Sequence, residues 1–436
     1  MKQAEFKRRR TQLMKMTGKN SIAILPSASQ LTRNRSVDFP FRQESDFLYL
    51  TGFSEPGAVL VLIPGRKHGE FILFCREKDP MQETWHGRRA GQEGVMQDFG
   101  ADDSFPIDDI DDILPGLLEG TDSIYNIMGI NSDFDQRLIG WVNHLKRQSP
   151  AGAHVPSEFV SLEYLLHDMR LFKSREEIKL MKKSAAINIE AHKRAIASCK
   201  PGKFEYQIAA EYDYIFGQNN AGFAYPSIVG GGANGCILHY NENSDELNDG
   251  DLLLIDAGCE VEGYASDITR TFPVNGRFSA AQREVYSIVL EAQKAAIMKV
   301  SPGNHWNEPH QAAVKVITRG LLEMKLLKGK LNTLIKEQAY RKFYMHRTGH
   351  WLGLDVHDVG DYKVGDQWRL LEAGMVLTVE PGIYIPAQTS GVHRKWWDIG
   401  IRIEDDVLVT KDGCEVLTAK LPSEIDQIEA MMVANH

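Results

Sequence analysis

No stretch of the 436-residue sequence is apolar for long enough to cross a membrane, which takes about 18 continuous apolar residues. A basic cluster, Lys7-Arg8-Arg9-Arg10, lies near the N-terminus, but the nearest apolar run covers only residues 22–25. Such a run is too short for a signal peptide and is typical of a buried strand. We therefore expect no membrane partner, and a protein that is soluble in the cytoplasm.

The sequence also has few cysteines and no excess of basic charge. Its 5 cysteines are odd in number, and no two are spaced as C-x-x-C, which argues against a disulfide framework or a cysteine-rich zinc site and favours a reducing compartment. Its 50 Lys and Arg residues face 59 Asp and Glu residues, for a net charge of −9. No basic field is therefore expected to hold nucleic acid or an anionic membrane.

The composition, 43% hydrophobic and 25% charged, is that of a folded globular protein. At about 150 residues per domain, its length predicts two or three domains. In the first half, apolar runs at residues 58–63 and 71–74 are bounded by turn residues and predict strands of a buried sheet. Short strands alternate there with helices, so we expect an α/β fold.

A domain boundary is expected near residue 173. Residues 174–177, Ser-Arg-Glu-Glu, have the pattern of a capping box that begins a helix. Apolar residues at helical spacing follow until Pro201-Gly202 ends this helix. The sequence is therefore divided into an N-terminal α/β domain, residues 1–173, and a second domain, residues 174–436.

The second domain contains a weak internal repeat. Its first helix, a Pro-Gly pair and a second amphipathic helix at residues 203–216 are followed by apolar strands. The same order returns about a hundred residues later, with helices at residues 280–300 and 306–322 on either side of Pro302-Gly303. The repeat predicts two related halves.

Two aspartates mark a predicted hairpin in the first of these halves. Asp256 ends the apolar run 251–256, and Asp267 lies in a second predicted strand, residues 264–271, with Gly263 at the turn. An aspartate at a strand end most often caps a turn. A hairpin that turns at Gly263, however, places the two nearly opposite each other, where like charges repel. A divalent cation bound by both carboxylates would remove the repulsion.

Two glutamates end apolar strands in the second half. Glu380 follows residues 375–379, and Glu404 follows residues 399–403, where alternation places Arg402 and Glu404 on one face. Either glutamate alone is commonly a solvated acid. Together with the aspartates they predict a shared site, because unpaired buried carboxylates are costly.

The histidines near residue 350 are further candidates. A lone histidine is usually a core or surface residue, but His346 and His350 are four residues apart and share a face in a helix or a strand. His357 follows them, and His239 is a fourth candidate. The glycines of this segment argue against a helix, and no H-E-x-x-H zinc-protease pattern occurs.

Other enzyme motifs are absent or lack their context. Residues 230–235 satisfy G-x-G-x-x-G, but a strand-like apolar run, residues 236–240, follows instead of a helix, so a dinucleotide site is not supported. No phosphate loop and no G-x-S-x-G elbow is present.

Four carboxylates and one imidazole exceed the three protein ligands of a catalytic mononuclear zinc. They balance the charge of two divalent ions, and an oxygen-rich set with one nitrogen suits Mn²⁺ better than Zn²⁺ or copper. Two such ions polarise a carbonyl and generate hydroxide near neutral pH. The residues themselves therefore predict metal-assisted hydrolysis.

The order of these residues resembles the five-ligand site of the pita-bread metallopeptidases, a family that includes creatinase and the methionine aminopeptidases. The matching strings are His346-x-x-Gly349-His350-x-x-Gly353-x-x-x-His357-x-x-Gly360, Val379-Glu380-Pro381-Gly382 and Gly400-Ile401-Arg402-Ile403-Glu404-Asp405. Residues 40–53, Pro-Phe-Arg-Gln-Glu-Ser-Asp-Phe-Leu-Tyr-Leu-Thr-Gly-Phe, resemble the N-terminal half of the Xaa-Pro aminopeptidases (aminopeptidase P). The resemblance thus spans almost the whole chain and implies a pita-bread catalytic domain behind the α/β domain.

The resemblance implies a metal-ligand set and a reaction. Asp256 would hold one Mn²⁺, His350 and Glu380 would hold the other, and Asp267 and Glu404 would bridge them; Co²⁺ and Zn²⁺ are alternatives. A hydroxide between the ions would attack the carbonyl before proline, with Glu380 also moving protons.

The resemblance also implies roles for residues beside the metals. His239 and His357 would hydrogen-bond the scissile peptide and its oxyanion, and His346 would line the proline pocket. Arg402 would connect the surrounding side chains, together with Tyr384.

The expected substrates are peptides with proline in the second position, and the expected assembly is a homo-oligomer, a dimer or a tetramer. The N-terminal domain would control substrate access and oligomer contacts, and Trp85 is a candidate for a loop lent to a neighbouring subunit, although it is equally an ordinary surface aromatic.

The alternatives are a prolidase, which cleaves only Xaa-Pro dipeptides, and a non-enzymatic pita-bread module that holds peptides. Residues 49–53 favour the aminopeptidase over the prolidase. Binding modules usually lose metal ligands, whereas all five are present here.

Overall fold

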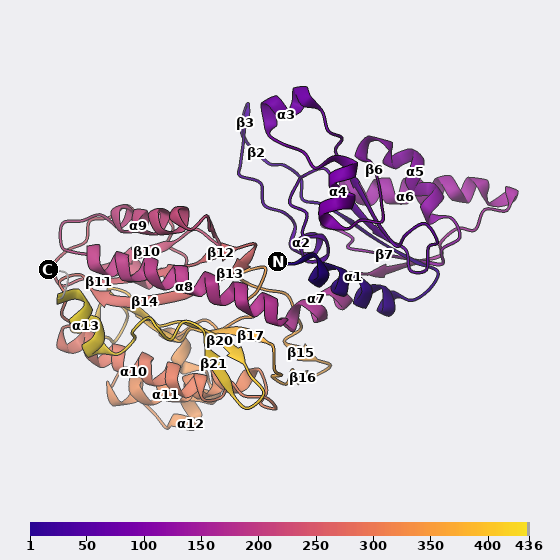
Figure 1. Ribbon diagram of the computed structural model, residues 1–436. Coiled ribbons are helices and arrows are strands. Elements are labelled where there is room, and N and C mark those ends of the chain that lie inside the picture. The colour runs from indigo at the N-terminus through magenta and orange to yellow at the C-terminus, as the bar shows by residue number, and fades with distance from the viewer. Residues whose placement is uncertain (434–436) are drawn as a thin grey trace. The chain divides into compact units, whose positions relative to one another are not determined.

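The computed structural model describes residues 1–433 and forms two compact units, Met1–Met169 and Arg170–His436 (Figure 1). Each unit has a hydrophobic core of its own. Across the described residues, no helix is long and apolar enough to span a bilayer.

The first unit is built on a mixed six-stranded sheet. In order across the sheet its strands are β6 (Asp103–Pro106), β5 (Phe71–Cys75), β4 (Val59–Leu62), β1 (Ser21–Pro26), β7 (Ser123–Asn126) and β8 (Glu158–Ser161). Ile22 and Ile24 of β1 face one core cluster, while the alternate residues Ala23 and Leu25 are also buried. Because both faces of the central strands are covered, their sequences read as continuous apolar runs.

Helices and one exposed hairpin complete this unit. The hairpin pairs β2 (Thr32–Asn34) with β3 (Val37–Asp38). The helices are α1 (Gln3–Thr17), α2 (Ser45–Thr51), α3 (Pro80–His86), α4 (Gly91–Phe99), η1 (Ile107–Asp109), α5 (Ile110–Leu118), α6 (Ser132–Gln148), η2 (Ser149–Ala151) and α7 (Glu163–Leu171).

The N-terminal basic cluster is partly structural. Arg9 and Arg10 of α1 are buried and donate to the carbonyl oxygens of Tyr49 at 2.9 Å and Leu50 at 2.8 Å. The Arg10 guanidinium also lies 3.9 Å from the ring centroid of Phe71. These two charges therefore bind α1 to the rest of the first unit.

The second unit repeats one arrangement of helices and strands. Its helices are α8 (Arg175–Ser198), α9 (Glu205–Gln218), η3 (Gly232–Cys236), α10 (Ala280–Ile297), α11 (Asn307–Glu323), α12 (Leu331–Lys336), η4 (Ala339–Lys342), η5 (Arg394–Trp396) and α13 (Ile425–Val433). Figure 1 shows α8 and α9 along one side of the strands and α10 and α11 along the other. The order that the sequence predicted, a helix pair followed by strands, thus occurs twice.

All strand pairs of the second unit are antiparallel. Three sheets have three strands: β10 (Ile228–Gly231), β11 (Leu252–Ala257) and β14 (Ile268–Pro273); β13 (Tyr264–Ala265), β12 (Cys259–Val261) and β9 (Gly222–Phe223); β17 (Val376–Val379), β20 (Asp405–Val409) and β21 (Cys414–Val416). Two further pairs are β18 (Gly382–Ile385) with β19 (Ile399–Arg402) and β15 (Lys363–Val364) with β16 (Gln367–Trp368).

The capping box that was predicted at the start of α8 is present. Ser174 Oγ accepts from the Glu177 amide at 3.4 Å, and Glu177 Oε2 accepts from the Ser174 amide at 2.8 Å. Tyr264 donates to the other Glu177 oxygen at 3.0 Å, so the cap also joins α8 to β13.

Two local expectations were wrong. Asp256 pairs with Thr269, so Asp267 is two residues away from the position directly opposite it, in the break between β13 and β14. An offset of two residues keeps both aspartates on one face. Residues 236–240 form no strand. η3 runs into a turn there, and the backbone of Gly235 packs directly against β19.

Two close backbone contacts need glycine. A Cβ on Gly400 would lie 2.1 Å from the Gly235 carbonyl oxygen, and one on Gly349 would lie 2.0 Å from the Thr378 carbonyl oxygen. The first contact holds η3 on β19. The second holds the histidine segment on β17, where the His350 carbonyl accepts from the Thr378 amide at 2.9 Å and the Thr348 carbonyl accepts from the Glu380 amide at 2.8 Å.

Arg270 on β14 connects the end of the chain to the sheets. Its guanidinium is 1% exposed and donates to Asp405 Oδ1 at 2.8 Å and to the Glu404 carbonyl oxygen at 2.6 Å. It also donates to the carbonyl oxygens of Leu421 at 2.9 Å and Pro422 at 3.0 Å. Arg270 thus holds the backbone of Glu404 in place.

We expect Arg270→Met to lower the free energy of unfolding of the second unit by about 3–5 kcal/mol, because it leaves the buried Asp405 carboxylate without its cation. Urea titration in the presence of a chelator, followed by tryptophan fluorescence, measures the change without a contribution from bound metal.

Arg283→Met is the matched control. Arg283 binds Glu429 at 2.7 Å but is 41% exposed, so its loss should cost less than about 1 kcal/mol. Equal losses in the two variants would contradict a special role for the buried Arg270–Asp405 pair.

Candidate metal centre and active site

One cavity of the second unit, about 870 Å³ in volume, is lined by all the residues that the sequence analysis proposed as metal ligands or catalytic groups, with the exception of Tyr384, which contacts Arg402 behind it. The acids come from strand ends or breaks, which hold their backbones rigidly, and His350 comes from the segment along β17. The proposed residues that line the cavity are Asp256, Asp267, His350, Glu380, Glu404, His239, His346, His357 and Arg402.

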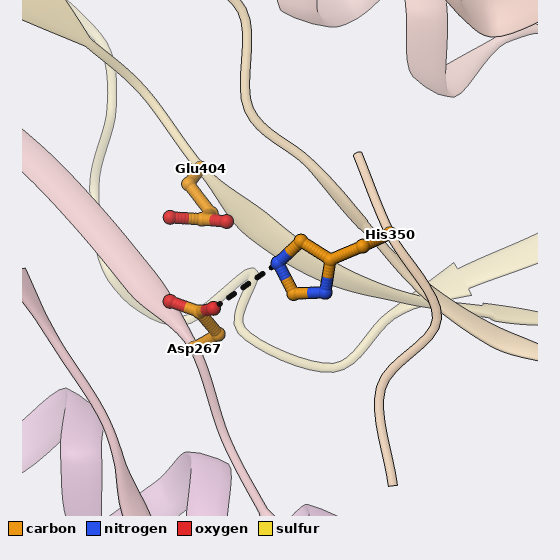
Figure 2. Close-up of side chains that lie close together, drawn as sticks. All are labelled: Asp267, His350 and Glu404. Carbon is orange, nitrogen blue, oxygen red and sulfur yellow. Dashed lines mark ion pairs between the residues drawn. The ribbon is translucent and has the colours of Figure 1, made fainter. Parts of the chain in front are cut away.

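Three of them meet at the centre. Figure 2 shows Asp267, His350 and Glu404 pointing toward one another from three different segments. One ligand atom of each lies within 4.8 Å of the other two, and His350 Nε2 is 3.5 Å from Asp267 Oδ2. These three side chains could hold a metal ion.

The hydrogen bond at the far side of the His350 ring sets its tautomer. Nδ1 lies 2.9 Å from the Trp351 carbonyl oxygen, which can only accept, so Nδ1 carries the proton. In the neutral ring, the lone pair of Nε2 then faces the carboxylates of Asp267, at 3.5 Å, and Glu380, at 3.8 Å. Acceptors that face acceptors require a cation between them, and this is how metal-binding histidines are oriented.

Asp256 and Asp267 meet at a tyrosine that the sequence did not indicate. The Tyr225 hydroxyl lies 2.6 Å from Asp256 Oδ1 and 2.5 Å from Asp267 Oδ1. Burial and the two acids raise its pKa well above the ordinary value, so the hydroxyl keeps its single proton. One proton cannot satisfy two carboxylates. Tyr225 precedes Pro226 outside the predicted elements, and no local pattern marks it.

Arg402 supplies a fixed positive charge at the other side of Asp256. Its Nη2 donates to Asp256 Oδ2 at 2.6 Å, its Nη1 donates to the Tyr384 hydroxyl at 3.0 Å, and its Nε donates to Thr269 Oγ1 at 3.2 Å. Thr269 in turn donates to Glu404 Oε2 at 2.6 Å. Arg402 therefore reaches two of the four acids, one directly and one through Thr269.

The site holds more negative charge than its own cations balance. Burial raises the pKa of Glu380 to about 7. Burial and the charges of Asp267 and Glu380 raise the pKa of Glu404 well above its ordinary value. Burial also raises the pKa of Asp256, against the effect of Arg402. In the absence of a further cation these carboxylates hold on to protons, so the donor set fits divalent metal ions.

His350 and Asp267 shift each other's pKa. Burial acts to lower the pKa of His350, but its hydrogen bond with Asp267 and the charge of Glu380 raise this pKa to about 9. Burial acts to raise the pKa of Asp267, and the hydrogen bond from His350 brings it below the ordinary value instead. Without metal, a proton on His350 Nε2 takes the place of the missing cation.

His346 lies in a chain of hydrogen bonds that starts at Arg402. Since the Tyr384 hydroxyl accepts from Arg402, it donates to His346 Nε2, 2.9 Å away. His346 Nδ1 lies 2.7 Å from the Arg347 carbonyl oxygen and therefore donates to it. Burial lowers the pKa of His346 to about 3, so the ring is neutral.

His357 lies beside His350, with 4.3 Å between the ring centroids and the planes at 76°. Burial and the charge of His350 lower the pKa of His357, so its ring is neutral at physiological pH. His239 lines the same cavity.

Buried carboxylates hold the segments that carry His239 and His357 in place through hydrogen bonds. Glu205, the first residue of α9, accepts from the Gly231 amide at 2.7 Å, the Asp245 amide at 2.9 Å and the Tyr240 hydroxyl at 2.7 Å. It thereby closes the segment that carries His239. Its hydrophobic neighbours in the sequence gave no indication of this role.

Asp358 has the corresponding position next to His357. Its carboxylate accepts from Arg170 at 2.6 Å and from Lys173 at 2.9 Å, and all three side chains are buried. Its amide donates to the Trp351 carbonyl oxygen at 2.9 Å. The loop between His350 and His357 is therefore closed at both ends. The one sequence signal for this role of Asp358 was an acidic residue directly after His357.

A buried carboxylate and histidine cluster at the strand ends of an antiparallel α/β unit defines a metal-dependent hydrolase. Residues 179–411 match metallopeptidase family M24, and residues 6–125 match the aminopeptidase P N-terminal domain. The chain belongs to metallopeptidase family M24, as the resemblance of its motifs predicted, and its fold is that of an aminopeptidase P N-terminal domain followed by a pita-bread catalytic domain.

Relatives match over the full length of the chain. An Xaa-Pro aminopeptidase of Haemophilus influenzae is 45% identical over 98% of this chain and 97% of its own. The structure of aminopeptidase PepP from Pseudomonas aeruginosa is 56% identical, with a TM-score of 0.99 over 100% of this chain and 99% of that chain. Escherichia coli aminopeptidase P with the inhibitor Pro-Leu is 44% identical, with a TM-score of 0.97 over the same shares.

Alanine variants of His350 and His357 distinguish a metal ligand from a residue that donates a hydrogen bond to the substrate. We expect His350→Ala to lose bound metal, because it removes the imidazole nitrogen at the centre, while His357→Ala keeps its metal and loses about 10²–10³-fold in kcat, the usual effect of removing one oxyanion donor. His239→Ala should behave like His357→Ala. Elemental analysis of the dialysed proteins and steady-state kinetics provide both readouts. Metal loss in His357→Ala but not in His350→Ala would reverse the assignment.

Metal removal should make stability depend on pH. His350, with a folded pKa of about 9 against 6.5, contributes stability that is present below its ordinary pKa and is lost as pH rises through the folded value. Glu380, raised to about 7 from 4.5, acts in the same direction, because its protonated form is favoured in the folded state. The metal-free protein should therefore unfold at a lower temperature at about pH 9 than at about pH 6.

The metal-loaded protein is the control, since bound ions replace these protons and metal affinity rises with pH. Its melting temperature should change much less over the same range. Parallel curves for the two forms would show that these groups do not exchange protons for metal.

Proposed function

We propose that the protein is a metal-dependent aminopeptidase that removes the first residue from peptides with proline in the second position. The observation that carries the proposal is the meeting of four carboxylates and His350 in one cavity, on a chain that is similar over its full length to Xaa-Pro aminopeptidases. The Pro-Leu inhibitor of the Escherichia coli structure supports a proline-specific substrate.

We propose two Mn²⁺ ions per chain, held by Asp256, Asp267, His350, Glu380 and Glu404. Five protein ligands exceed the needs of one catalytic zinc, and carboxylate oxygens suit Mn²⁺; Co²⁺ or Zn²⁺ could take its place. When bound, such ions supply a water-derived nucleophile near neutral pH and polarise the substrate carbonyl. The remaining chemistry belongs to the side chains around them.

Glu380 is the group that holds and moves a proton. Its carboxylate lines the cavity and can take up a proton and deliver it to the leaving nitrogen of proline. His239 and the neutral ring of His357 line the same cavity and can donate to the carbonyl oxygen as negative charge develops there.

The chemistry of an X-Pro bond explains why the site needs a rigid pocket for proline. It has no amide N–H, and it restricts the residue before proline, so an enzyme cannot hold it by an extended backbone ladder. A rigid pocket replaces that ladder. His346, held by Tyr384 and Arg402, forms a pocket wall that cannot move without breaking this chain.

We propose that residues 1–173 control substrate access and oligomer contacts, and that residues 174–436 carry the chemistry. A homodimer or homotetramer, a role for Trp85 at a neighbouring active site and a location in the cytoplasm are part of the same proposal. Trp85 is 78% exposed on α3, as a residue that reaches a partner must be.

We expect Ala-Pro-Ala-Ala to be cleaved before proline with Mn²⁺ present, and the reaction to stop with a chelator. Ala-Ala-Ala-Ala should be a far poorer substrate, because alanine does not fill the rigid pocket. Chromatography of the released alanine measures both rates.

Ala-Pro separates the aminopeptidase from the prolidase. A higher kcat/KM for Ala-Pro than for Ala-Pro-Ala-Ala would identify a prolidase. No cleavage of either peptide by the metal-loaded protein would favour a binding module.

A further inference from the structure

The active-site cavity has charges of opposite sign in different parts of its wall. The acids gather around His350, whereas the wall also contains Arg347 together with Trp306, Tyr362 and Trp368. A peptide has a positive amino end and a negative carboxyl end, so a cavity with both signs fits a whole short peptide better than a cavity with acids alone.

The structure holds the Arg347 guanidinium in place without neutralising it. Nη2 donates to Asn307 Oδ1 at 2.8 Å, and the guanidinium carbon lies 4.8 Å from the Trp368 ring centroid. Within residues 1–433, no acidic side chain forms an ion pair with Arg347. A guanidinium has five N–H donors, so donors remain for a carboxylate.

Arg347 is also close to the reacting groups. It directly follows His346, whose Nδ1 is 3.6 Å from Glu380 Oε2, and neighbouring Cα atoms are about 3.8 Å apart. His346 and Arg347 line the same cavity, so the wall that contains Arg347 adjoins the pocket assigned to proline. The part of a substrate that follows proline would reach it within about one or two residues.

The surroundings of Arg347 strengthen an ion pair. Partial burial lowers its pKa, but a guanidinium remains charged at physiological pH. Aromatic walls and partial exclusion of water lower the local dielectric constant, so a carboxylate binds there more strongly than on an open surface. Planar guanidinium and carboxylate groups also fit each other through two parallel hydrogen bonds.

We propose that Arg347 binds a carboxylate in the part of the substrate that follows proline, and that this contact makes the enzyme prefer short peptides ending close to the site. The proposal rests on the proposed aminopeptidase function and adds a specificity-determining residue to it. The carboxylate is the C-terminus of a short peptide; an acidic side chain at the same place offers the same chemistry.

The test compares substrates that differ only in this charge. For the Mn²⁺-loaded enzyme we expect a KM about tenfold lower for Ala-Pro-Ala than for its C-terminal amide, Ala-Pro-Ala-NH2. Arg347→Ala should raise the KM of the acid by about the same factor and leave the KM of the amide and both kcat values nearly unchanged. Added salt should weaken binding of the acid only.

Lys363→Ala is the matched control. Lys363 Nζ also lies over the Trp368 ring, 4.7 Å from its centroid, but Lys363 is not among the residues that line the cavity. Its removal should not separate acid from amide. Ala-Pro-Glu-NH2 distinguishes the two carboxylate sources: if it regains the lower KM in an Arg347-dependent way, side-chain acids are accepted, and if it does not, the C-terminus alone is recognised.

Equal effects of Arg347→Ala on acid and amide would overturn the proposal, because a merely structural role changes both substrates alike. Equal KM values for acid and amide in the unaltered enzyme would overturn it as well. Failure of the unaltered enzyme to cleave either tripeptide would instead contradict the proposed function, so the two failures are distinguishable.

Discussion

The mutual repulsion of four carboxylates in one buried cavity is the constraint on which the structure of this protein depends. Arg402 balances part of this charge through Asp256, and a proton on His350 balances another part. Burial, together with the charge that remains, raises the pKa of Glu380 and Glu404. Such an arrangement is unfavourable by itself and becomes favourable with bound divalent ions, so metal binding and stability are coupled. Around this centre the protein places groups that stay neutral, His346 and His357, where they can donate or accept hydrogen bonds without adding charge.

Rigid backbones keep the repelling groups together. Each acid comes from a strand end or a break between strands. Contacts that only glycine permits hold η3 on β19, between Gly235 and Gly400, and the histidine segment on β17, between Gly349 and Thr378. Arg270 adds a further constraint, because it holds the backbone of Glu404 and the side chain of Asp405. Backbone contacts and charged hydrogen bonds fix the acids, and the apolar core adds Trp306 and Ile228 to the cavity wall.

Buried carboxylates also act outside the metal centre. Glu205 and Asp358 accept several hydrogen bonds each and close the segments that carry His239 and His357. Arg402, Tyr384 and His346 form a third fixed unit. Together they hold the active-site histidines, two of them neutral, at defined places around a charged centre. Arg347 lines the same cavity as His346, and we propose that it contacts the end of the substrate that follows proline.

Local patterns in the sequence were enough to predict the capping box at Ser174, the buried strands near residues 60 and 72, the repeated helix pairs and the acids at strand ends. These features depend on interactions within a few residues, such as helical spacing, turn residues and alternation along a strand. The two-residue offset of Asp267, the turn after η3, the contact of Tyr225 with two aspartates, the role of Glu205 and the place of Arg347 in the cavity wall depended on the tertiary structure. Most of these involve groups tens of residues apart, and the offset of Asp267 depends on the pairing register of two strands. How strands pair and helices pack decides these contacts, and no local periodicity carries that information.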